Sequence, residues 1–441
     1  MLASLLLAVA APSAAPPFAA TFSDLEKIGQ SNYTHFWMPA PLVLSSALPN
    51  ARLLAAVDLC GDGTACPPPH HPQNHAAYFS ESVGGGPWSA TAGVSMGTVI
   101  RINNSVTRGF GSLKLDPATN TTATCTYEDW IQDTSGQIRP LTPGKTKLAQ
   151  ITGLPKMLAV AYFMPSPSAV IRSGSKEVYL TQFYGYVEGK TAGCTYIVSR
   201  GCYSVVTIAS EDRGTSWFYK SSIDWDARMP THVEGPCESS LATMVDGQTL
   251  LSVFRVSSYQ NMWQSVSTDG GSTFSAPSEI NAWAVFPELR ALPSGALVLT
   301  AGRPGIGLWL ADGRSAGAGP EPMSWEFYNL AQEHNKLAGS TDSGILYPAP
   351  ELAVANASSR PSNPIITKAY TGLAFIGCEE EASPLSSSVS SGGGCTVVVS
   401  YDRLANGNAG PDPGPGPHGA VDAAFTMRVI VTPAAADGDW P

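Results

Sequence analysis

Apolar residues along this chain recur in paired short segments, and each pair is joined by a tight turn. The pairs occupy residues 40–57, 168–187, 238–256, 287–303, and 369–377 with 395–403. The dipeptides Asp246-Gly247 and Ser294-Gly295 between alternating apolar residues are typical of β-hairpin turns. The pattern therefore predicts antiparallel strands rather than helices.

The repetition of these hairpins predicts the architecture. One hairpin is too small to bury its own faces, and here the hairpins return roughly every 45–60 residues, which corresponds to four strands per unit. Units of this size are typical of the blades of a β-propeller. The chain is therefore predicted to be all-β, with its blades packed around a central axis.

Composition supports this prediction and excludes other classes. Only 14% of the 441 residues are charged and 43% are hydrophobic, so a disordered chain is excluded. The 43 glycines and 36 prolines spread along the chain disfavour a long helical array. A net charge of −10 repels phosphate, so no nucleic-acid partner is expected.

A second motif lies between the hairpins. Residues 210–217 and 267–274 both fit S-x-D-x-G-x-[ST]-[WF], with aspartates 57 residues apart. In such a turn the aspartate accepts backbone N–H bonds, the glycine takes an unusual φ, and the aromatic ring fills space between strands. Degenerate copies are expected near residues 84–88 and 312–325. A calcium loop is the alternative, but the carboxylates that it needs are too few.

The N-terminus and the cysteines indicate a secretory route. Residues 1–20 contain an apolar run followed by small residues and prolines, as a signal peptide does. No later stretch is long and apolar enough to span a membrane. Four N-x-[ST] sequons occur, at Asn32, Asn103, Asn120 and Asn356. The protein is therefore expected to be a secreted glycoprotein with a single domain over residues 21–441.

The eight cysteines are even in number, as expected for disulfides. Short loops are closed if Cys60 pairs with Cys66, Cys194 with Cys202 and Cys378 with Cys395, although sequence leaves the connectivity open. Zinc at Cys60, Cys66 and the nearby histidines 70, 71 and 75 is the alternative, but five residues between the cysteines are more than structural zinc sites use. No metal and no cofactor are expected.

The order of several segments resembles the sialidase (neuraminidase) superfamily, six-bladed propellers with Asp-box repeats, over about residues 34–433. Glu238 and Arg255, 17 residues apart, match the family's glutamate and second arginine. Arg303 precedes an apolar strand, as the third arginine does, and Tyr370 in K-A-Y-T-G-L matches the nucleophile motif. The resemblance implies a six-bladed β-propeller that removes terminal sialic acid from glycoconjugates and acts as a monomer.

Two positions depart from the family pattern. The first arginine motif, Y/F-R-I-P-A, reads F-W-M-P-A here, so Trp37 stands where the arginine is expected. The acid/base aspartate is either Asp58 or Asp62, because an insertion with two cysteines obscures the register. Without the first arginine, the loss of a charge-assisted pair costs about 1.5–3 kcal/mol of substrate binding.

The chemistry of an acidic sugar explains these residue types. Sialic acid carries a carboxylate on the reacting carbon, which repels a carboxylate nucleophile. A neutral Tyr370 can approach it while Glu238 takes the phenol proton. The planar forks of Arg255 and Arg303 suit the sugar's carboxylate.

Two alternatives remain open. In the first alternative, the chain is an Asp-box propeller that binds glycans without hydrolysing them, and Trp37 stacks on a sugar. Otherwise it is a hydrolase for a related acidic sugar whose carboxylate lies elsewhere.

Overall fold

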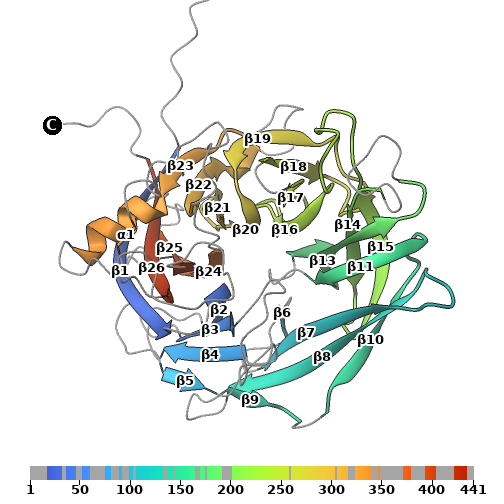
Figure 1. Ribbon diagram of the computed structural model, residues 1–441, viewed down its shortest axis with the longest axis horizontal. Helices are drawn as coiled ribbons and strands as arrows, with labels where there is room; N and C mark the ends of the chain where they lie inside the picture. The colour runs from blue at the N-terminus through green and yellow to red at the C-terminus, as the bar shows by residue number, and fades with distance from the viewer. Residues whose placement is uncertain are drawn as a thin grey trace, which may run out of the picture.

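In the computed structural model most of the described residues lie in β-strands, as the hydrophobic pattern predicts. The sheets lie around a central axis and extend outward from it, as in a propeller (Figure 1). In β2 to β5 only the backbone is described. The structure describes residues 17–31, 36–45, 52–59, 75–80, 89–91, 99–102, 106–132, 138–142, 145–163, 169–173, 176–190, 201–257, 260–302, 305–315, 323–339, 346–347, 371–378, 393–403 and 422–434.

Among the described residues, four sheets have four antiparallel strands each. Their first strands lie nearest the axis in Figure 1. In order from the axis outward they are β2 (Phe36–Ser45), β3 (Arg52–Leu59), β4 (His75–Ser80) and β5 (Ser89–Thr91); β16 (Cys237–Thr243), β17 (Leu250–Arg255), β18 (Asn261–Ser267) and β19 (Ser278–Trp283); β20 (Val285–Ala291), β21 (Ala296–Gly302), β22 (Gly307–Asp312) and β23 (Glu326–Asn329); and β24 (Thr371–Cys378), β25 (Cys395–Arg403), β26 (Asp422–Pro433) and β1 (Phe18–Ser31).

The remaining described strands form one ten-stranded sheet. Its strands are β6 (Val99–Arg101), β7 (Val106–Leu115), β8 (Ala123–Gln132), β9 (Ile138–Pro140), β10 (Lys147–Thr152), β11 (Met157–Phe163), β12 (Ala169–Ser173), β13 (Lys176–Val187), β14 (Ser204–Ser210) and β15 (Ser216–Ile223). A parallel pairing of β10 with β15, from Gln150–Ser216 to Thr152–Phe218, joins its two halves. The described strands thus pair into five sheets, and the count of six blades remains a prediction.

The hairpins predicted from the sequence are confirmed. All five pairs of segments form antiparallel strands: β2 with β3, β12 with β13, β16 with β17, β20 with β21, and β24 with β25. Gly247 and Gly295 have φ values of +71° and +91°, which residues with a Cβ rarely adopt. The predicted turn glycines therefore make the hairpin geometry accessible.

The two S-x-D-x-G segments form turns with the same hydrogen bonds. In the first repeat turn (Ser210–Trp217), Asp212 Oδ1 accepts from Ser216 N at 2.9 Å, and Ser210 Oγ accepts from Gly214 N at 2.7 Å. In the second repeat turn (Ser267–Phe274), Asp269 Oδ1 accepts from the amide of residue 273 at 2.9 Å. Burial would raise the pKa of Asp212, but hydrogen bonds from Ser216, Ser210 and Thr215 together outweigh burial and lower that pKa.

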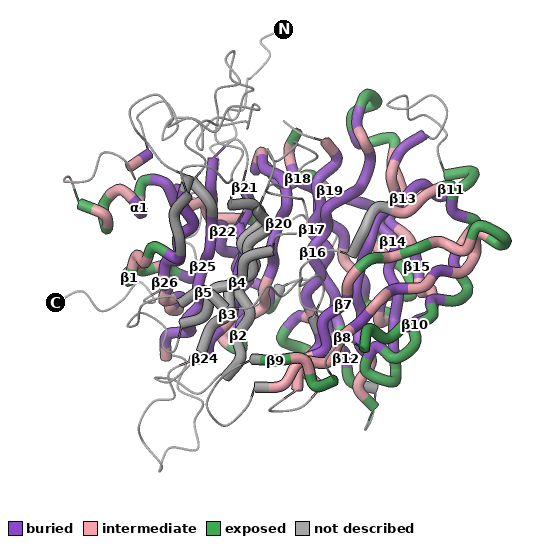
Figure 2. The backbone as a smooth tube through the Cα atoms, turned by 60° about the horizontal axis from the view of Figure 1, so that its bottom comes forward, coloured by how far each residue is buried: buried purple, intermediate pink, exposed green. Residues whose placement is uncertain are grey.

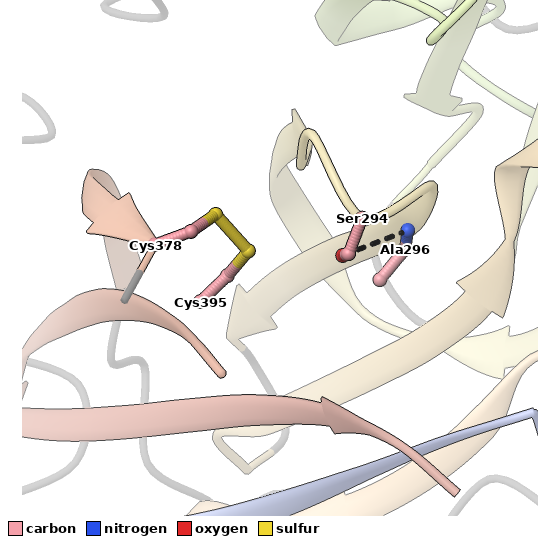
Figure 3. Close-up of a disulfide and its surroundings, with 4 residues drawn as sticks. All are labelled: Ser294, Ala296, Cys378 and Cys395. Carbon is pink, nitrogen blue, oxygen red and sulfur yellow. Dashed lines mark hydrogen bonds between the residues drawn. A yellow bond between two sulfur atoms is a disulfide. The ribbon is translucent and has the colours of Figure 1, made fainter. Parts of the chain in front are cut away.

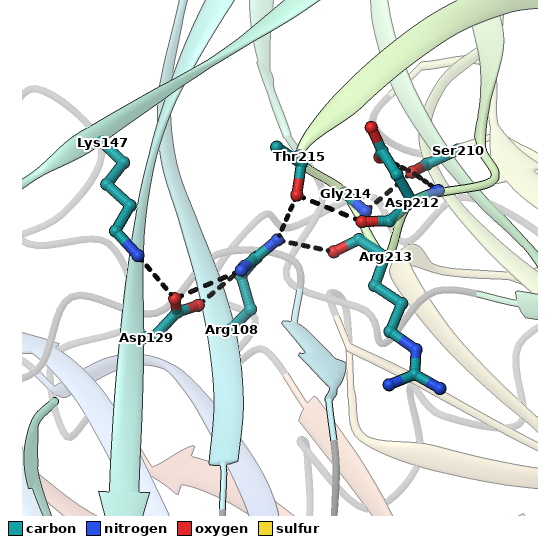
Figure 4. Close-up of polar contacts among 8 residues, drawn as sticks. All are labelled: Arg108, Asp129, Lys147, Ser210, Asp212, Arg213, Gly214 and Thr215. Atoms are coloured by element: carbon teal, nitrogen blue, oxygen red, sulfur yellow. Dashed lines mark hydrogen bonds and ion pairs between the residues drawn. The ribbon is translucent and has the colours of Figure 1, made fainter.

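Arg108 on β7 joins the first repeat turn to the other half of the ten-stranded sheet (Figure 4). Its Nη1 donates to Arg213 O at 2.9 Å and to Thr215 Oγ1 at 3.0 Å. Its Nε lies 2.7 Å from Asp129 Oδ1 on β8, and Lys147 on β10 contacts the same carboxylate at 2.9 Å. This buried arginine therefore has a structural role.

The first and last described strands close the ring together. β1 pairs antiparallel with β26 from Phe18–Pro433 to Ser31–Asp422, although the two strands lie about 400 residues apart. Phe18 is buried in the core of this sheet. β1 thus begins within residues 1–20, and the predicted signal peptide over those residues remains a prediction.

The described helix, α1 (Leu330–Ala338), covers the last sheet. Asn329 caps its first turn by accepting from Gln332 N at 3.1 Å. His334 is fully buried, and its Nδ1 lies 2.8 Å from Tyr401 Oη on β25. Burial differs between the two sides of the molecule in Figure 2. Strands β16 to β22 are mostly buried, whereas exposed residues lie around β9 and β10.

One predicted disulfide is confirmed. Cys378 at the end of β24 is bonded to Cys395 at the start of β25, and Figure 3 shows it together with the Ser294 turn between β20 and β21. Cys202 is also in a disulfide, with a partner outside the described residues. Cys125 and Cys237 are buried thiols. The predicted Cys60–Cys66 pair lies outside the described residues.

Candidate active site

The candidate site lies where the inner strand of a sheet begins and its second strand ends. An antiparallel hairpin brings these two ends together: Cys237 at the start of β16 is paired with Arg255 at the end of β17. The inner strands of the four-stranded sheets contact one another in turn, β16 with β20, β20 with β24, and β24 with β2, and β13 of the ten-stranded sheet contacts β16. Residues far apart in sequence can therefore meet at this end of the ring.

The same irregularity occurs at this position in three sheets. Between the pairs Cys237–Arg255 and Ser240–Val253, β16 advances three residues while β17 advances two. β20 has the same bulge between Val285–Gly302 and Glu288–Thr300, and β2 has it between Trp37–Asp58 and Ala40–Ala56. A bulge redirects a side chain away from the regular alternation. The three hairpins therefore present equivalent residues at this end of the ring.

Glu238 occupies the bulge of β16 in a strained conformation. Its φ is +41°, and Phe286 in the bulge of β20 has a φ of +54°. Positive φ is uncommon for residues with a Cβ and is frequent at functional sites. Leu289 N donates to Ser240 Oγ at 2.9 Å and ties β20 to β16 directly behind the bulge. The surrounding strands thus hold Glu238 in place.

Arg255 lies between two carboxylates. Its Nε is 3.1 Å from Glu238 Oε2, and its Nη2 is 2.6 Å from Glu234 Oε2. The exposed fractions of the side chains are 9% for Arg255, 7% for Glu238 and 16% for Glu234. The two residues predicted to belong together, Glu238 and Arg255, are thus brought together, and Glu234 joins them.

Cys237 completes the surroundings of Arg255. Its Sγ accepts from Arg255 Nε at 3.4 Å. Burial raises the pKa of the Cys237 thiol far above its ordinary value, although the Arg255 charge opposes this rise. Burial alone would lower the pKa of Arg255, but Glu238, Cys237 and Glu234 raise it well above its ordinary value. The thiol is therefore neutral and the guanidinium charged at every working pH.

Tyrosine rings border this cluster. The Tyr203 ring lies 4.3 Å from the Tyr186 ring and 4.9 Å from the Tyr184 ring, centroid to centroid. Tyr203 is partly exposed, and its N–H donates to Glu234 O at 2.7 Å. Burial, a hydrogen bond with Tyr186 and the nearby acidic groups raise the pKa of Tyr203 far above its ordinary value. Its hydroxyl therefore remains a neutral hydrogen-bonding group.

The other predicted site residues are placed only in part. Trp37 and Asp58 are paired with each other at the start of β2 and the end of β3, and Asp58 is also paired with His75 on β4. Asp58 thus holds in its sheet the register position that Arg255 holds in the sheet of β16 and β17. Asp62, Arg303 and Tyr370 lie outside the described residues, so their roles remain predictions.

Two features of this region were not predicted from the sequence. Glu234 lies in a loop, four residues before Glu238, and no pattern of alternation marks it. Glu288 and Arg290 form a second buried pair on β20, with Nη1 of the arginine 3.3 Å from Glu288 Oε2. Burial lowers the pKa of Arg290, and the Glu288 charge opposes that change. For the Glu288–Arg290 pair, the one sequence signal was the presence of charged residues within an otherwise apolar strand.

Comparison with known proteins gives a fold and no family. No family model and no curated protein matches the sequence. A protein of unknown function from Dyadobacter fermentans DSM 18053 is similar in structure, with a TM-score of 0.52, 13% identity, and 93% of this chain and 99% of that chain covered. The two therefore share a fold.

Two sialidase structures are more distantly similar. NanB sialidase from Streptococcus pneumoniae has a TM-score of 0.45 at 13% identity, with 93% of this chain and 71% of that chain covered. The Hadza microbial sialidase Hz136 has a TM-score of 0.37 at 14% identity, with 67% and 58% covered. At these scores nothing about activity follows.

Within the described part of the chain, no helix has the length and apolar character needed to cross a membrane. The described residues also contain no group of three or more His, Cys, Asp and Glu side chains that could hold a metal ion.

Proposed function

We propose that this protein is an exo-acting glycoside hydrolase of the sialidase type, which releases a terminal sialic acid or a related acidic sugar. The observation that carries the proposal is the buried contact of Glu238 with Arg255 at the inner end of a sheet. Sequence order pairs these two residues in the sialidase pattern. The strained φ of Glu238 is also typical of functional residues.

The positions of the remaining residues in the chain are consistent with one site. Tyr370 directly precedes Thr371, the first residue of inner strand β24, and Arg303 directly follows Gly302, the last residue of β21. Starts of first strands and ends of second strands are the positions that Glu238 and Arg255 occupy in their own sheet. These positions support a site that would combine a nucleophile, a base and two cations.

Each residue has a distinct step in the proposed reaction. The Tyr370 oxygen attacks the anomeric carbon while Glu238 takes its proton. The bond from that carbon to the leaving oxygen breaks, and Asp58 or Asp62 protonates that oxygen. A water molecule then attacks the anomeric carbon, gives one proton to the aspartate and displaces the Tyr370 oxygen. Glu238 returns the phenol proton to Tyr370. Arg255 and Arg303 bind the sugar's carboxylate throughout.

The decisive experiment is fluorophore release from a fluorogenic 2-α-sialoside. Replacing Tyr370 by Phe removes the nucleophilic oxygen and is expected to lower kcat at least about 100-fold. Tyr219→Phe on β15, away from the described site, is the matched control and should leave kcat unchanged. Release by Tyr370→Phe at the rate of the unmodified chain would reject Tyr370 as the nucleophile.

A second function is favoured by Trp37. This residue is the second of β2 and has the register position that Cys237 has in β16, and an aromatic ring there can stack on a sugar. The protein would then bind glycans without cleaving them. Glycan binding without fluorophore release, and unaffected by Tyr370→Phe, would support this function over hydrolysis.

A further inference from the structure

Glu234 is the outer of the two carboxylates on Arg255. Its side chain is 16% exposed, against 7% for Glu238, and its Oε2 lies 2.6 Å from Arg255 Nη2. A ligand that approaches Arg255 from solvent therefore meets Glu234 before Glu238. None of the family motifs in the sequence includes this residue.

The backbone holds Glu234 in this position. Glu234 O accepts from Tyr203 N at 2.7 Å, and Gly235 N donates to Val256 O at 3.0 Å. Gly235 has a φ of +93°, and a Cβ on it would lie 2.5 Å from Tyr203 O. Cys202, next to Tyr203, is in a disulfide. The carboxylate is thus a built part of the site rather than a mobile surface group.

The charges of the cluster do not favour a further anion. Among the described residues, Arg255 carries one positive charge and Glu234 and Glu238 one negative charge each, so these three have a charge of −1, and the second cation proposed for the site, Arg303, brings the sum to zero. A sugar carboxylate at Arg255 would be the third carboxylate on one guanidinium and would compete with Glu234 for Nη2. A neutral sugar hydroxyl meets no such repulsion.

We propose that Glu234 is a specificity-determining residue that opposes the binding of a sugar carboxylate at Arg255, so that acidic sugars are held weakly and neutral sugars are unaffected. The inference rests on the proposed function only in placing the sugar at Arg255. It concerns the strength of binding and not the cleavage step.

The test compares charge variants in binding and in kinetics. Glu234→Gln keeps an oxygen that accepts from Nη2 and removes the negative charge. It is expected to lower the Kd for free sialic acid and the KM for a 2-α-sialoside about tenfold, a change of about 1.4 kcal/mol. The kcat should change by less than about threefold, because Glu234 contacts no reacting atom. Methyl β-galactoside, a neutral probe, should bind all variants equally.

Two controls separate this effect from general charge and folding. Glu188→Gln removes one carboxylate from an exposed ion pair with Lys156, and it should leave both constants unchanged. Glu234→Asp keeps the charge and should behave like the unmodified chain. Thermal unfolding of each variant reports its folding.

Ionic strength tests the same repulsion. Because salt screens the interaction of Glu234 with the sugar carboxylate, the difference in Kd for sialic acid between the unmodified chain and Glu234→Gln should shrink as ionic strength rises, whereas methyl β-galactoside should not respond. A difference that stays constant as salt rises would contradict the proposal.

The outcomes distinguish this inference from the proposed function. An unchanged or raised Kd in Glu234→Gln, an equal gain in Glu188→Gln, or no binding of sialic acid by either chain overturns the role of Glu234. If Tyr370→Phe abolishes release while Glu234→Gln leaves KM unchanged, hydrolysis stands and the role of Glu234 falls. Tighter sialic acid binding in Glu234→Gln without any release keeps the role of Glu234 and rejects hydrolysis.

Discussion

Single residues in the repeat turns combine an unusual backbone with tight packing. Gly214 has a φ of +79°, and a Cβ there would overlap the Phe110 ring and lie 3.2 Å from Ile100 Cδ1. Gly247, in the β16–β17 hairpin, has a similar φ of +71° with nothing within 4 Å of such a Cβ. A comparison of Gly214 with Gly247 therefore distinguishes the destabilisation caused by a positive φ from that caused by a steric overlap.

Alanine substitutions at Gly247 and Gly214 should therefore destabilise the fold by different amounts. Gly247→Ala carries only the strain of positive φ and is expected to lower the free energy of unfolding by about 1–2 kcal/mol. Gly214→Ala adds overpacking against Phe110, which costs about 1–3 kcal/mol more. Urea unfolding of both variants measures the difference. Equal losses would show that the Phe110 ring gives way without cost.

Strands are joined across the ten-stranded sheet by buried charge as well as by hydrogen bonds. Arg108 makes a bidentate contact with Asp129, at 2.7 and 3.2 Å, and its Cζ lies 4.4 Å from the Tyr127 ring centre. Burial would raise the pKa of Asp129, but the hydrogen bonds and charges of Arg108 and Lys147 lower it. Removing the guanidinium would leave the carboxylate buried with Lys147 alone.

Arg108→Met is therefore expected to lower the free energy of unfolding by about 3–5 kcal/mol, the usual cost of breaking a buried ion pair. Arg108→Lys keeps the charge but loses the planar fork, so its loss should be smaller. Thermal and urea unfolding measure both variants. An Arg108→Met chain as stable as the original would show that the contacts of Arg108 with Asp129 and with the first repeat turn do not stabilise the sheet.

The whole molecule depends on the pairing of its first and last described strands. β1 completes the sheet of β24, β25 and β26, and Phe18 at its start lies under the Arg314 guanidinium, with Cζ 5.1 Å from the ring centre. Ala434 N donates to Pro17 O at 2.9 Å and extends this pairing by one bond. We therefore expect residues 17–20, within the predicted leader, to contribute to the stability of the ring.

Two truncations test this dependence. A chain that starts at Pro17 keeps β1 whole and should be as stable as the full chain. A chain that starts at Thr21 loses the burial of Phe18 and its pairing with Pro433, and should be less stable by about 3 kcal/mol or more. Thermal unfolding compares the two. Equal stability would show that residues 17–20 do not contribute to closure.

One contact of the candidate site, Glu238 with Arg255, could be predicted because its signals are local in sequence. Glu238 and Arg255 belong to the two strands of one hairpin, so register brings their backbones together, and the bulge at Glu238 completes the contact. Glu234 could not be predicted, since a loop conformation that depends on Gly235 and Tyr203 carries its side chain to Arg255. Loop positions follow from packing rather than from an alternating pattern.

By itself, the sequence determined the hairpins and the two repeat turns, and it made the Cys378–Cys395 bridge one of several possible pairings. Each depends on residues close in the chain, whose turn chemistry and alternation act without the rest of the fold. Only the tertiary structure decided that β10 pairs with β15, that β1 closes against β26, and that Arg255 lies between two carboxylates. Those contacts join segments whose partners no local pattern specifies, because burial and strand edges across the whole ring select them.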